Sequence, residues 1–288
     1  MLRTGTPATS RDRRYDLHTH SVYSDGTTSP GAIAEEAAGL GLAGFALTDH
    51  DTVDGWDAAR AASEEHGVDF LPGMEITTRH RWRSTHLLAY GPDLGRGRLS
   101  EEIAEVRRSR VERAREMVRL ISADYRISWE SVIGDGDAST VGRPHIADAL
   151  VVAGYFPHRS AVFSDLLRPG SPYYIDTYAL ETLDTIRMVR EAGGVPVLAH
   201  PAAGRSSRPV DPAALRSFAE AGLWGIELSH PENRAEWIPG LREQAGELGL
   251  VATGASDYHG AGKANRLGEC TSGAEVVEAV RALAAVPR

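Results

Sequence analysis

The sequence predicts an α/β fold, an incomplete or distorted barrel of parallel strands interrupted by an all-helical insertion. Short apolar runs bounded by Gly, Asp or His alternate with segments in which apolar residues recur every three to four positions. This alternation is typical of βαβ units around a parallel sheet. Seven such runs favour an incomplete or distorted barrel, and a block without strand patterns in the middle of the chain predicts the insertion.

The expected elements follow one another from the N-terminus. Strands are predicted at residues 15–20, 44–50, 69–77, 86–91, 195–200, 225–230 and 251–257. Helices are predicted at residues 29–42, 52–67, 179–194, 211–223 and 237–249. Ser29 followed by Pro30 is a typical helix start, whereas Gly41, Gly193 and Gly194 are typical of helix ends.

The block in the middle of the chain contains helical patterns only, at residues 99–124, 143–155 and 158–167. The predicted organisation is therefore a flexible N-terminus at residues 1–14, a barrel domain at 15–93 and 173–288, and a helical insertion at 94–172. Arginines between Arg107 and Arg119 could indicate an RNA-binding helix, but Glu105, Glu112 and Glu116 accompany them at helical spacing. A solvent-exposed, ion-paired helix explains this run better.

The overall composition excludes some classes of partner. The formal net charge of -9 argues against long duplex nucleic acid and anionic membranes, because such binding depends on a basic surface. Cys270 is the only cysteine, so no intrachain disulfide is possible. The first fourteen residues contain no apolar segment of signal-peptide length, and no run of 18 apolar residues occurs. We therefore expect a cytoplasmic protein without a membrane partner.

The predicted strands end in histidines and carboxylates. These residues are His18, His20, Asp49, His50, Asp51, Glu75, His200, Glu227, His230, Asp257 and His259. The carboxyl ends of parallel strands form one rim, where ligand sites gather, so we expect these side chains to converge. Imidazole and carboxylate without thiolate suit Zn, Mn or Fe. The supply exceeds the four ligands of a structural zinc site, which favours an open, multinuclear centre.

Two pairs of residues predict shared ions by their spacing. Residues two apart on a strand point to the same face, so His18 and His20 can bind one metal ion. Asp257 and His259 repeat this spacing with one carboxylate and one imidazole. The second pair is what makes a metal site the better explanation of the first.

Other candidates have a structural explanation beside the functional one. Asp25 precedes a glycine, and Asp-Gly is a common turn pair, so only its place near the two histidines favours metal binding. Asp49 or Asp51 could cap the following helix, which leaves His50 as the preferred ligand of that segment.

The remaining carboxylate and histidines divide in the same way. Glu75 lies in an apolar run, where an unpaired carboxylate is costly to bury and a metal would offset the cost. His86 begins its predicted strand, so from spacing alone a surface or core histidine is an equal explanation. No role is assigned to His66, His80 and His158, which lie in polar surroundings.

Six motifs occur in a characteristic order, "DLHTHSVYSDG", "LTDHDTVDG", "GMEI", "HLLAY", "VLAHP" and "ASDYHG". With them the chain resembles the polymerase and histidinol phosphatase (PHP) family of metal-dependent phosphoesterases over nearly its whole length from Tyr15. It is similar to the branch with a helical insertion, whose characteristic segment corresponds to Val141 to Val151. Members of that branch hydrolyse 3',5'-nucleoside bisphosphates and related small nucleotides, and some degrade short oligonucleotides from the 5' end.

The resemblance implies a distorted (β/α)7 barrel with a trinuclear site, which would bind two or three divalent ions of Mn, Zn or Fe. One metal would be bound by His18, His20 and Asp257, with Glu75 as a bridge to a neighbour. Another would be bound by Asp25, His50 and His259. The third would be bound by His86, His200 and the other oxygen of Glu75.

The expected reaction is hydrolysis of a phosphate monoester of a small nucleotide, a 3',5'-nucleoside bisphosphate or a nucleoside monophosphate, by a phosphoric ester hydrolase. Two ions about 3.5 to 4 Å apart lower the pKa of a bridging water and hold the phosphoryl oxygens in line. We expect attack by metal-bridged hydroxide, inversion at phosphorus and no phosphoenzyme, because no Ser or Cys stands in a nucleophile motif.

Basic residues near the predicted rim are candidates for phosphate and proton chemistry. Arg143 and His145 suit a second phosphate or the leaving group, since arginine binds phosphate bidentately, and the insertion would then act as a lid. His230 is a candidate for protonating the leaving oxygen, with a supporting role beside the metals as the alternative. Lys263 and Arg266 are further phosphate candidates. Family relatives often carry a basic residue where this chain reads "YYIDTYALE" from residue 173 to 181.

Three other functions fit the same residues. A histidinol-phosphate phosphatase uses the same metal chemistry without needing the insertion. A 5'-3' exonuclease would use the insertion to guide a short oligonucleotide, although the acidic balance and few aromatics are unlike the basic, stacking grooves of single-strand binders. The alternative that is not an enzyme is a metal-binding regulatory module. A degenerate module of this kind would be expected to lack some of the metal ligands.

Overall fold

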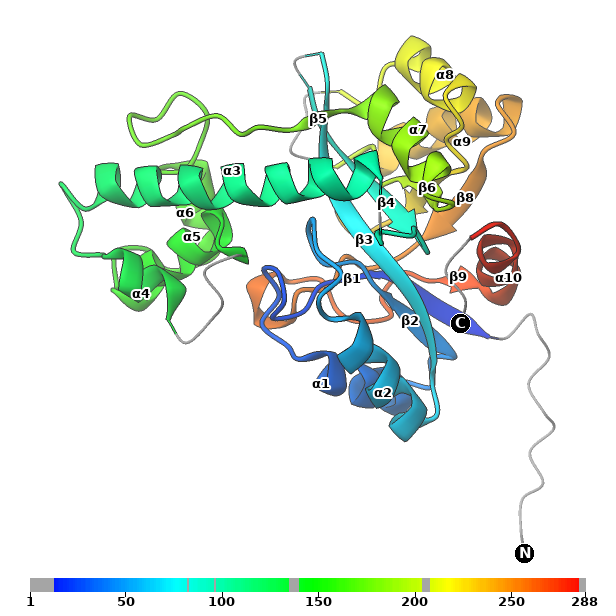
Figure 1. The fold of residues 1–288 in the computed structure, drawn as a ribbon, viewed down its shortest axis with the longest axis horizontal. Helices are drawn as coiled ribbons and strands as arrows, with labels where there is room; N and C mark the ends of the chain where they lie inside the picture. Colours follow the sequence, from blue (N-terminus) through cyan, green and yellow to red (C-terminus); the bar gives the residue numbers. More distant parts are fainter. Residues whose placement is uncertain (1–12, 82, 96, 135–139, 204–207, 285–288) are drawn as a thin grey trace, which may run out of the picture.

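A twisted sheet that wraps into a nearly closed barrel forms the body of the protein in this computed structural model (Figure 1). The structure describes residues 13–81, 83–95, 97–134, 140–203 and 208–284, so most of the N-terminus expected to be flexible lies outside the described residues. The strands are β1 (Arg14–Thr19), β2 (Gly44–Leu47), β3 (Asp69–His80), β4 (Arg83–Tyr90), β5 (Leu180–Glu181), β6 (Val195–Leu198), β7 (Gly225–Ser229), β8 (Val251–Gly254) and β9 (Ser272–Gly273).

The sheet has the order β8-β7-β6-β4-β3-β2-β1-β9, and β5 pairs with β3. Its two ends approach each other beyond β1 and β8, where the N–H of His20 donates to the carbonyl oxygen of Tyr258 at 2.8 Å. All seven expected strands are present, so the predicted distorted barrel is confirmed. The two-residue strands β5 and β9 were not expected, because so short a segment carries no periodicity.

The prediction of a purely parallel sheet is wrong at β4. This strand runs antiparallel to both β3 and β6. The cause is the connection between β3 and β4, which spans only residues 81 and 82, and a turn of two residues can join only antiparallel strands. A parallel neighbour would need a crossover of a dozen or more residues. The first half of β4 therefore lies at the rim formed by the carboxyl ends of the neighbouring strands.

Five helices cover the barrel where the sequence predicts them: α1 (Pro30–Gly39), α2 (Trp56–His66), α7 (Thr182–Glu191), α8 (Pro212–Glu220) and α9 (Ile238–Glu247). Ser29 caps α1 by accepting a hydrogen bond from the N–H of Ala32 at 3.2 Å. Gly41 and Gly193 adopt left-handed φ values of 67° and 68° just after α1 and α7, as expected of helix ends. Helix α10 (Ala274–Leu283), near the C-terminus, was not expected. No helix among the described residues is long and apolar enough to span a membrane.

The described residues between β4 and β5 form helices and no strand: α3 (Arg98–Ile121), α4 (Trp129–Ile133), α5 (Arg143–Val152) and α6 (Arg159–Ser164). We call these four helices the helical block. Figure 1 shows α3 running from the barrel to the far side of the block. Leu99, Ile103 and Val106 of α3 pack in the barrel core, whereas Met117 and Val118 pack in a separate core of the block.

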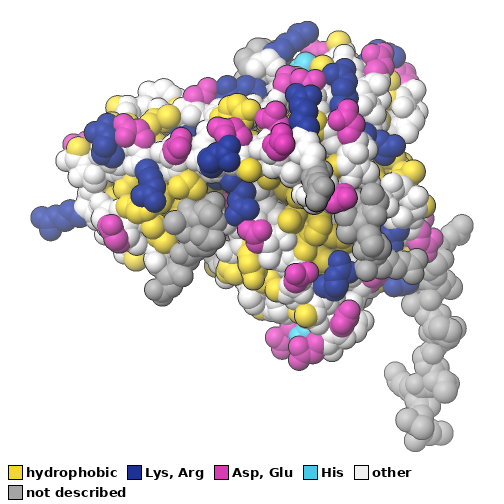
Figure 2. Space-filling view, viewed as in Figure 1, with side chains coloured by type: hydrophobic (Ala, Val, Ile, Leu, Met, Phe, Trp, Pro, Cys, Tyr) yellow, Lys and Arg dark blue, Asp and Glu magenta, His cyan; other side chains and the backbone are white. Residues whose placement is uncertain are grey.

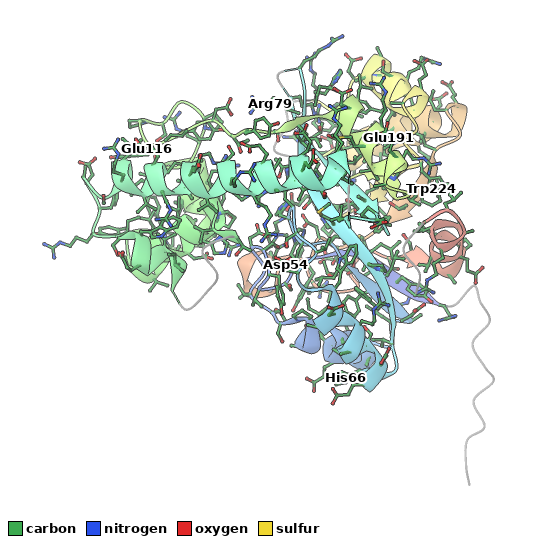
Figure 3. All side chains as sticks on the ribbon, in the orientation of Figure 1. Asp54, His66, Arg79, Glu116, Glu191 and Trp224 are labelled. Atoms are coloured by element: carbon green, nitrogen blue, oxygen red, sulfur yellow. The ribbon has the colours of Figure 1, made fainter. Side chains whose placement is uncertain are left out.

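The exposed face of α3 is laced with ion pairs, as the sequence predicts. Arg119 pairs with Glu116 and Arg108 with Glu105, and Figure 2 shows acidic and basic side chains mixed along this side of the molecule. Glu116 projects from the outer side of α3 in Figure 3, and Asp54 lies beneath the helix. The N–H groups of Arg107 reach Asp54 at 2.9 Å, so α3 is also tied to the barrel.

Candidate metal centre

Nine residues that the sequence and the family resemblance predict as metal ligands lie together at the rim of the barrel. Their ligand atoms form three overlapping groups within 4.8 Å, namely His20 with Asp25, His50 and His259; His18 with His20, Glu75 and Asp257; and His50 with Glu75 and His86. His200 joins them through its Nε2 atom, which is 3.0 Å from Glu75.

Glu75 occupies the middle of this cluster. Its Oε2 atom is 3.3 Å from His18 Nε2, 3.1 Å from His20 Nε2 and 3.1 Å from His50 Nδ1. Its Oε1 atom is 2.6 Å from His86 Nδ1 and 3.0 Å from His200 Nε2. Each carboxylate oxygen thus faces a different set of imidazoles, which is the geometry required of a carboxylate that bridges two ions.

Two further groups flank Glu75. Oδ1 of Asp257 is 3.4 Å from His18 Nε2 and 3.3 Å from His20 Nε2. Oδ1 of Asp25 is 3.2 Å from His259 Nε2. A role in the turn alone therefore does not account for Asp25, because its carboxylate points into the cluster.

Most of the predicted ligands stand at or just beyond the strand ends, and two of them have strained backbone conformations. His200 has a φ of 28° and Asp257 a φ of 56°, a left-handed conformation that non-glycine residues rarely adopt. Strain of this kind costs about 1–3 kcal/mol per residue and clusters at functional sites. Here it turns both side chains toward Glu75 and His18.

The chemistry of the cluster fits divalent cations. Four of its buried polar atoms have no hydrogen-bond partner: His50 Nδ1, His230 Nε2, Asp257 Oδ1 and His259 Nε2. A buried polar atom without a partner costs about 1–3 kcal/mol, and native proteins rarely tolerate several together. A cation at this position would satisfy the lone pairs of His50, Asp257 and His259 at once.

The charges of the cluster point in the same direction. Burial raises the pKa of Glu75, but His50, His86 and His18 outweigh it and hold the pKa well below its usual value. Burial lowers the pKa of His50 well below its usual value. For His20 burial opposes protonation, yet Asp257 and Glu75 raise the pKa to about 9. Ions that bind here would have to displace that proton, so binding would strengthen with rising pH.

Glu227, which the sequence placed at the rim without assigning it a role, supports the cluster. Its Oε1 atom is 3.2 Å from His18 Nδ1, and its Oε2 atom accepts from the backbone N–H of His200 at 2.8 Å. A carboxylate on the far nitrogen of a ligating histidine fixes the ring and its tautomer. The available signal was its position on β7, two residues before the strand end at the same rim.

Asp49 and Asp51 also have supporting roles. Asp49 accepts hydrogen bonds from Ser21 and Ser24 in the loop after β1, which holds the segment between His20 and Asp25. Asp51 accepts from the N–H of Thr77 at 2.9 Å and pairs with Arg110 of α3. Neither belongs to the groups around Glu75, in agreement with the preference for His50.

His230 and His145 both present an Nε2 proton. Nδ1 of His230 accepts from the backbone N–H of Glu232 at 3.1 Å, so the proton of its neutral ring is on Nε2, 3.7 Å from Asp257 Oδ2. Nδ1 of His145 likewise accepts from the N–H of Gly142 at 3.1 Å. Burial lowers the pKa of His145, against the opposing effect of Asp25.

The remaining predicted residues differ in position. Lys263 lies at the cluster, with its Nζ atom 2.5 Å from Asp257 Oδ2. The guanidinium of Arg143 lies over the rings of Phe163 and Tyr174, at 5.4 and 5.7 Å from their centroids. Arg266 is 84% exposed and contacts Glu269, so the structure does not bring it to the cluster.

The segment at residues 173–181, which contains no basic residue, contributes a network of aromatic and acidic side chains. Asp176 forms a two-pronged ion pair with Arg79, with N–O distances of 3.0 and 2.7 Å. The hydroxyl of Tyr174 donates to Asp176 at 3.5 Å. This segment therefore brings an aromatic ring to Arg143 and is itself tied to β3.

Two arginines of α3 add to the basic groups at the rim. Arg110 donates to Thr77 at 3.0 Å as well as to Asp51. Arg113 has a buried Nε atom without a hydrogen-bond partner. Burial lowers its pKa, and the neighbouring charges of Arg143 and Arg110 lower it further. The sequence predicted that both arginines lie in a solvent-exposed run. Charge spacing could not show that they face the barrel, because this depends on how α3 packs against it.

The chain is similar to several known proteins. A family model described as the PHP domain matches residues 16–134. The chain is 30% identical to the 3',5'-nucleoside bisphosphate phosphatase of Chromobacterium violaceum, over 87% of this chain and 89% of the relative. It is 34% identical to the phosphoribosyl 1,2-cyclic phosphate 1,2-diphosphodiesterase of Eggerthella lenta, over 85% and 94%. It is 27% identical to a 5'-3' exoribonuclease of Haemophilus influenzae, over 86% and 90%.

Solved structures share the fold. A predicted metal-dependent phosphoesterase from Bifidobacterium adolescentis superposes with a TM-score of 0.91 at 40% identity, over 94% of this chain and 96% of the other. A Chromobacterium violaceum protein described as an amidohydrolase, with bound sulfate, superposes with a TM-score of 0.81 at 30% identity, over 90% and 91%.

Proposed function

Because the chain belongs to the PHP domain family and is a metal-dependent phosphoric ester hydrolase, we propose that it hydrolyses a phosphate monoester of a small nucleotide, a 3',5'-nucleoside bisphosphate or a nucleoside monophosphate. The observation that carries the proposal is the contact of one buried carboxylate, Glu75, with five imidazoles beneath a helical block that brings arginines to the same rim. Such a site combines cation binding with anion binding, as phosphate ester hydrolysis requires.

We assign the metal ligands in three sets, and Glu75 bridges the first and the third. The sets are His18, His20 and Asp257; Asp25, His50 and His259; and His86 and His200. When bound, two or three divalent ions of Mn, Zn or Fe would lower the pKa of a water molecule and neutralise charge on the phosphoryl group. Support comes from buried atoms of His50, Asp257 and His259 that have no hydrogen-bond partner.

The protein's own histidines supply the proton that the leaving oxygen needs. His230 is our candidate for this role, because its Nε2 atom carries the proton of the neutral ring and has no hydrogen-bond partner. His145 is the second candidate, since it reaches the rim from the helical block and its lowered pKa keeps it neutral near pH 7.

The basic groups of the helical block would bind the substrate's charges. Arg143 suits the second phosphate of a bisphosphate. Arg110 and Arg113 of α3 would strengthen the same anion site, because the charges of Arg143 and Arg110 disfavour the charged form of Arg113 and an anion would relieve that effect. Lys263 would contact phosphate from the barrel side. We propose that residues 94–172 act in this way as a lid that determines specificity.

The relatives suggest two other substrates for this site. The Haemophilus influenzae relative is a 5'-3' exoribonuclease, which favours short oligonucleotide ends as the second candidate. The Eggerthella lenta relative acts on a phosphoribosyl cyclic phosphate, which adds a cyclic diester to the compounds worth testing.

Phosphate release from a panel of substrates tests the proposal. The Mn-loaded chain would be assayed on adenosine 3',5'-bisphosphate, AMP, a ribose cyclic phosphate, histidinol phosphate and a 5'-phosphorylated oligonucleotide. We expect the fastest release from adenosine 3',5'-bisphosphate and none from the Asp257→Ala variant, which should remain folded. Faster cleavage of the oligonucleotide would instead support an exonuclease. Metal binding without turnover on any compound would support a regulatory module.

A further inference from the structure

We propose that Arg159 is a positioning residue that fastens the helical block to the metal centre and fixes the loop that carries Asp25. This inference rests on the proposed function, because it assigns Asp25 to a metal set. It concerns a residue at the junction of three chain segments that are far apart in the sequence. These are the loop after β1, the start of α6 and the turn after β8.

The first contact is inside the helical block. Arg159 is the first residue of α6, and its side chain is only 12% exposed. Its Nε atom donates to Oδ1 of Asp148 at 2.8 Å, and its Nη2 atom donates to Oδ2 of the same carboxylate. A two-pronged pair of this kind fixes the plane of the guanidinium. Asp148 belongs to α5, so the orientation of Arg159 is set by that helix.

The second contact crosses to the barrel. The Nη1 atom of Arg159 donates to the backbone carbonyl oxygen of Asp25 at 3.2 Å. The carboxylate of the same Asp25 faces His259 at 3.2 Å and His50 at 3.9 Å. The guanidinium therefore holds the main chain of a residue whose side chain points into the metal cluster.

The third contact explains a glycine in the turn after β8. A Cβ atom on Gly262 would lie 2.6 Å from Nη1 of Arg159 and 3.0 Å from its Cζ. Gly262 is not among the residues with left-handed φ, so space rather than backbone conformation favours glycine here. The Arg159 guanidinium thus rests directly on the chain that follows Asp257 and His259.

Thr27 joins the same two barrel loops to each other. Its N–H donates to the carbonyl oxygen of His259 at 3.1 Å, and its hydroxyl oxygen accepts from the N–H of Ala261 at 2.8 Å. The loop with Asp25 and the turn with His259 therefore form one unit. Arg159 lies against this unit from the side of the helical block.

The position of His145 makes this junction relevant to catalysis. His145 precedes Asp148 by three residues in α5, and residues three apart lie on the same face of a helix. The contact from Asp148 through Arg159 to Asp25 therefore holds His145 and Arg143 at one distance from the metal cluster. Its loss should weaken both ion binding at Asp25 and substrate binding by the block.

The fold should survive the loss of Arg159. The Asp148 side chain is 44% exposed, so its carboxylate can be solvated by water when its partner is removed. Breaking the pair therefore leaves no buried unpaired charge, which is the usual cause of severe destabilisation.

The test measures metal binding and kinetics in variants that disturb the junction from opposite sides. Arg159→Gln removes the charge and the two-pronged pair, and Gly262→Ala pushes the guanidinium away from the barrel. Arg119→Gln, at the exposed pair with Glu116, is the matched control. We expect the first two variants to weaken Mn binding, measured by calorimetry without substrate, by about 10–100-fold, the range for residues that orient metal ligands. KM should rise more than kcat falls, and the control should match the unaltered protein.

A double-variant comparison separates positioning from general destabilisation. In the Asp25→Asn background Arg159→Gln should cause no further loss of Mn affinity, because its effect passes through Asp25. Additive losses, or unchanged Mn affinity and KM in both Arg159→Gln and Gly262→Ala, would overturn the inference. The calorimetric result is independent of turnover, so inactivity of the unaltered protein on every substrate would refute the proposed function alone.

Discussion

Oε1 of Glu75 lies 2.6 Å from Nδ1 of His86 on the neighbouring antiparallel strand. The register pairs His86 with Thr77, two residues beyond Glu75, so the first half of β4 meets the rim of the barrel. The other oxygen of Glu75 faces His18, His20 and His50. One side chain therefore joins the imidazoles in β4 and after β6 to those at the end of β1 and after β2.

Replacing Glu75 by Gln should abolish the proposed binding of two or three ions. The amide keeps the shape of the side chain but offers one neutral oxygen in place of two anionic ones. Supporting residues cost about 10–100-fold in metal affinity when they are changed, so a bridging ligand should cost at least about 100-fold. Elemental analysis after Mn or Zn loading would measure the ions per chain. Unchanged stoichiometry and phosphate release would contradict the bridging role.

Replacing Glu227 by Gln should have a smaller effect of the same kind. Glu227 contacts the far nitrogen of His18 and the backbone N–H of His200, and the amide can still accept from that N–H group. We expect a loss of about 10–100-fold in metal affinity with the circular dichroism spectrum unchanged. A loss as large as that of Glu75→Gln would mean that Glu227 binds an ion directly.

Replacing Arg113 by Met should separate stability from substrate binding. Burial and the charges of Arg143 and Arg110 lower the pKa of Arg113, which means that its positive charge destabilises the folded protein near neutral pH. Thermal unfolding should therefore show an equal or higher Tm for the variant. KM should rise about 10–100-fold, the equivalent of a lost hydrogen bond to a charged group of about 1.5–3 kcal/mol. Arg115→Met, which alters the neighbouring contact with Trp129, is the control, and a lower Tm with unchanged KM in Arg113→Met would contradict this role.

The ion pair of Asp69 and Arg281, which lies away from the metal cluster, should make the stability of the protein depend on pH. Burial raises the pKa of Asp69, but the two-pronged pair with Arg281 outweighs it and lowers the pKa below the ordinary 3.8. A carboxyl with a lowered folded-state pKa stabilises the protein above its unfolded-state pKa, and this contribution is lost as the pH falls through the folded-state value.

Arg281→Gln tests this dependence. The variant should lose about 1 kcal/mol near neutral pH, and its Tm should approach that of the unaltered protein below about pH 4. Thermal unfolding at a series of pH values would measure the difference. A constant difference across the series would show that packing rather than charge stabilises this pair.

The parts of the site that could be predicted are those with local spacing. His18 and His20 share a strand face, and Asp257 with His259 repeats the pattern, so neighbouring residues alone favoured a metal. The strands themselves were recognisable because each is a short apolar run that ends in polar residues. The sequence therefore predicted the order of the seven longer strands and of most of the helices between them.

The parts that could not be predicted depend on contacts across the barrel. From spacing alone His86 had no clear role, since the direction of a strand depends on the length of its connection, and only the family resemblance assigned it to a metal. Asp25 looked like a turn residue because its partner His259 is more than 230 residues away. Arg110 and Arg113 looked solvent-exposed because charge spacing shows which residues share a helix face but not which face meets the barrel.

Helix α3 limits how the protein can be divided for engineering. Leu99, Ile103 and Val106 complete the barrel core, while the other end of the same helix organises the block. An excision of residues 94–172 would therefore leave a hole in the barrel rather than a minimal catalytic unit. A shortened enzyme, or a chimera that borrows the block of a relative with another substrate, should be spliced within α3 after Val106. There one continuous helix passes from the barrel core to the core of the helical block.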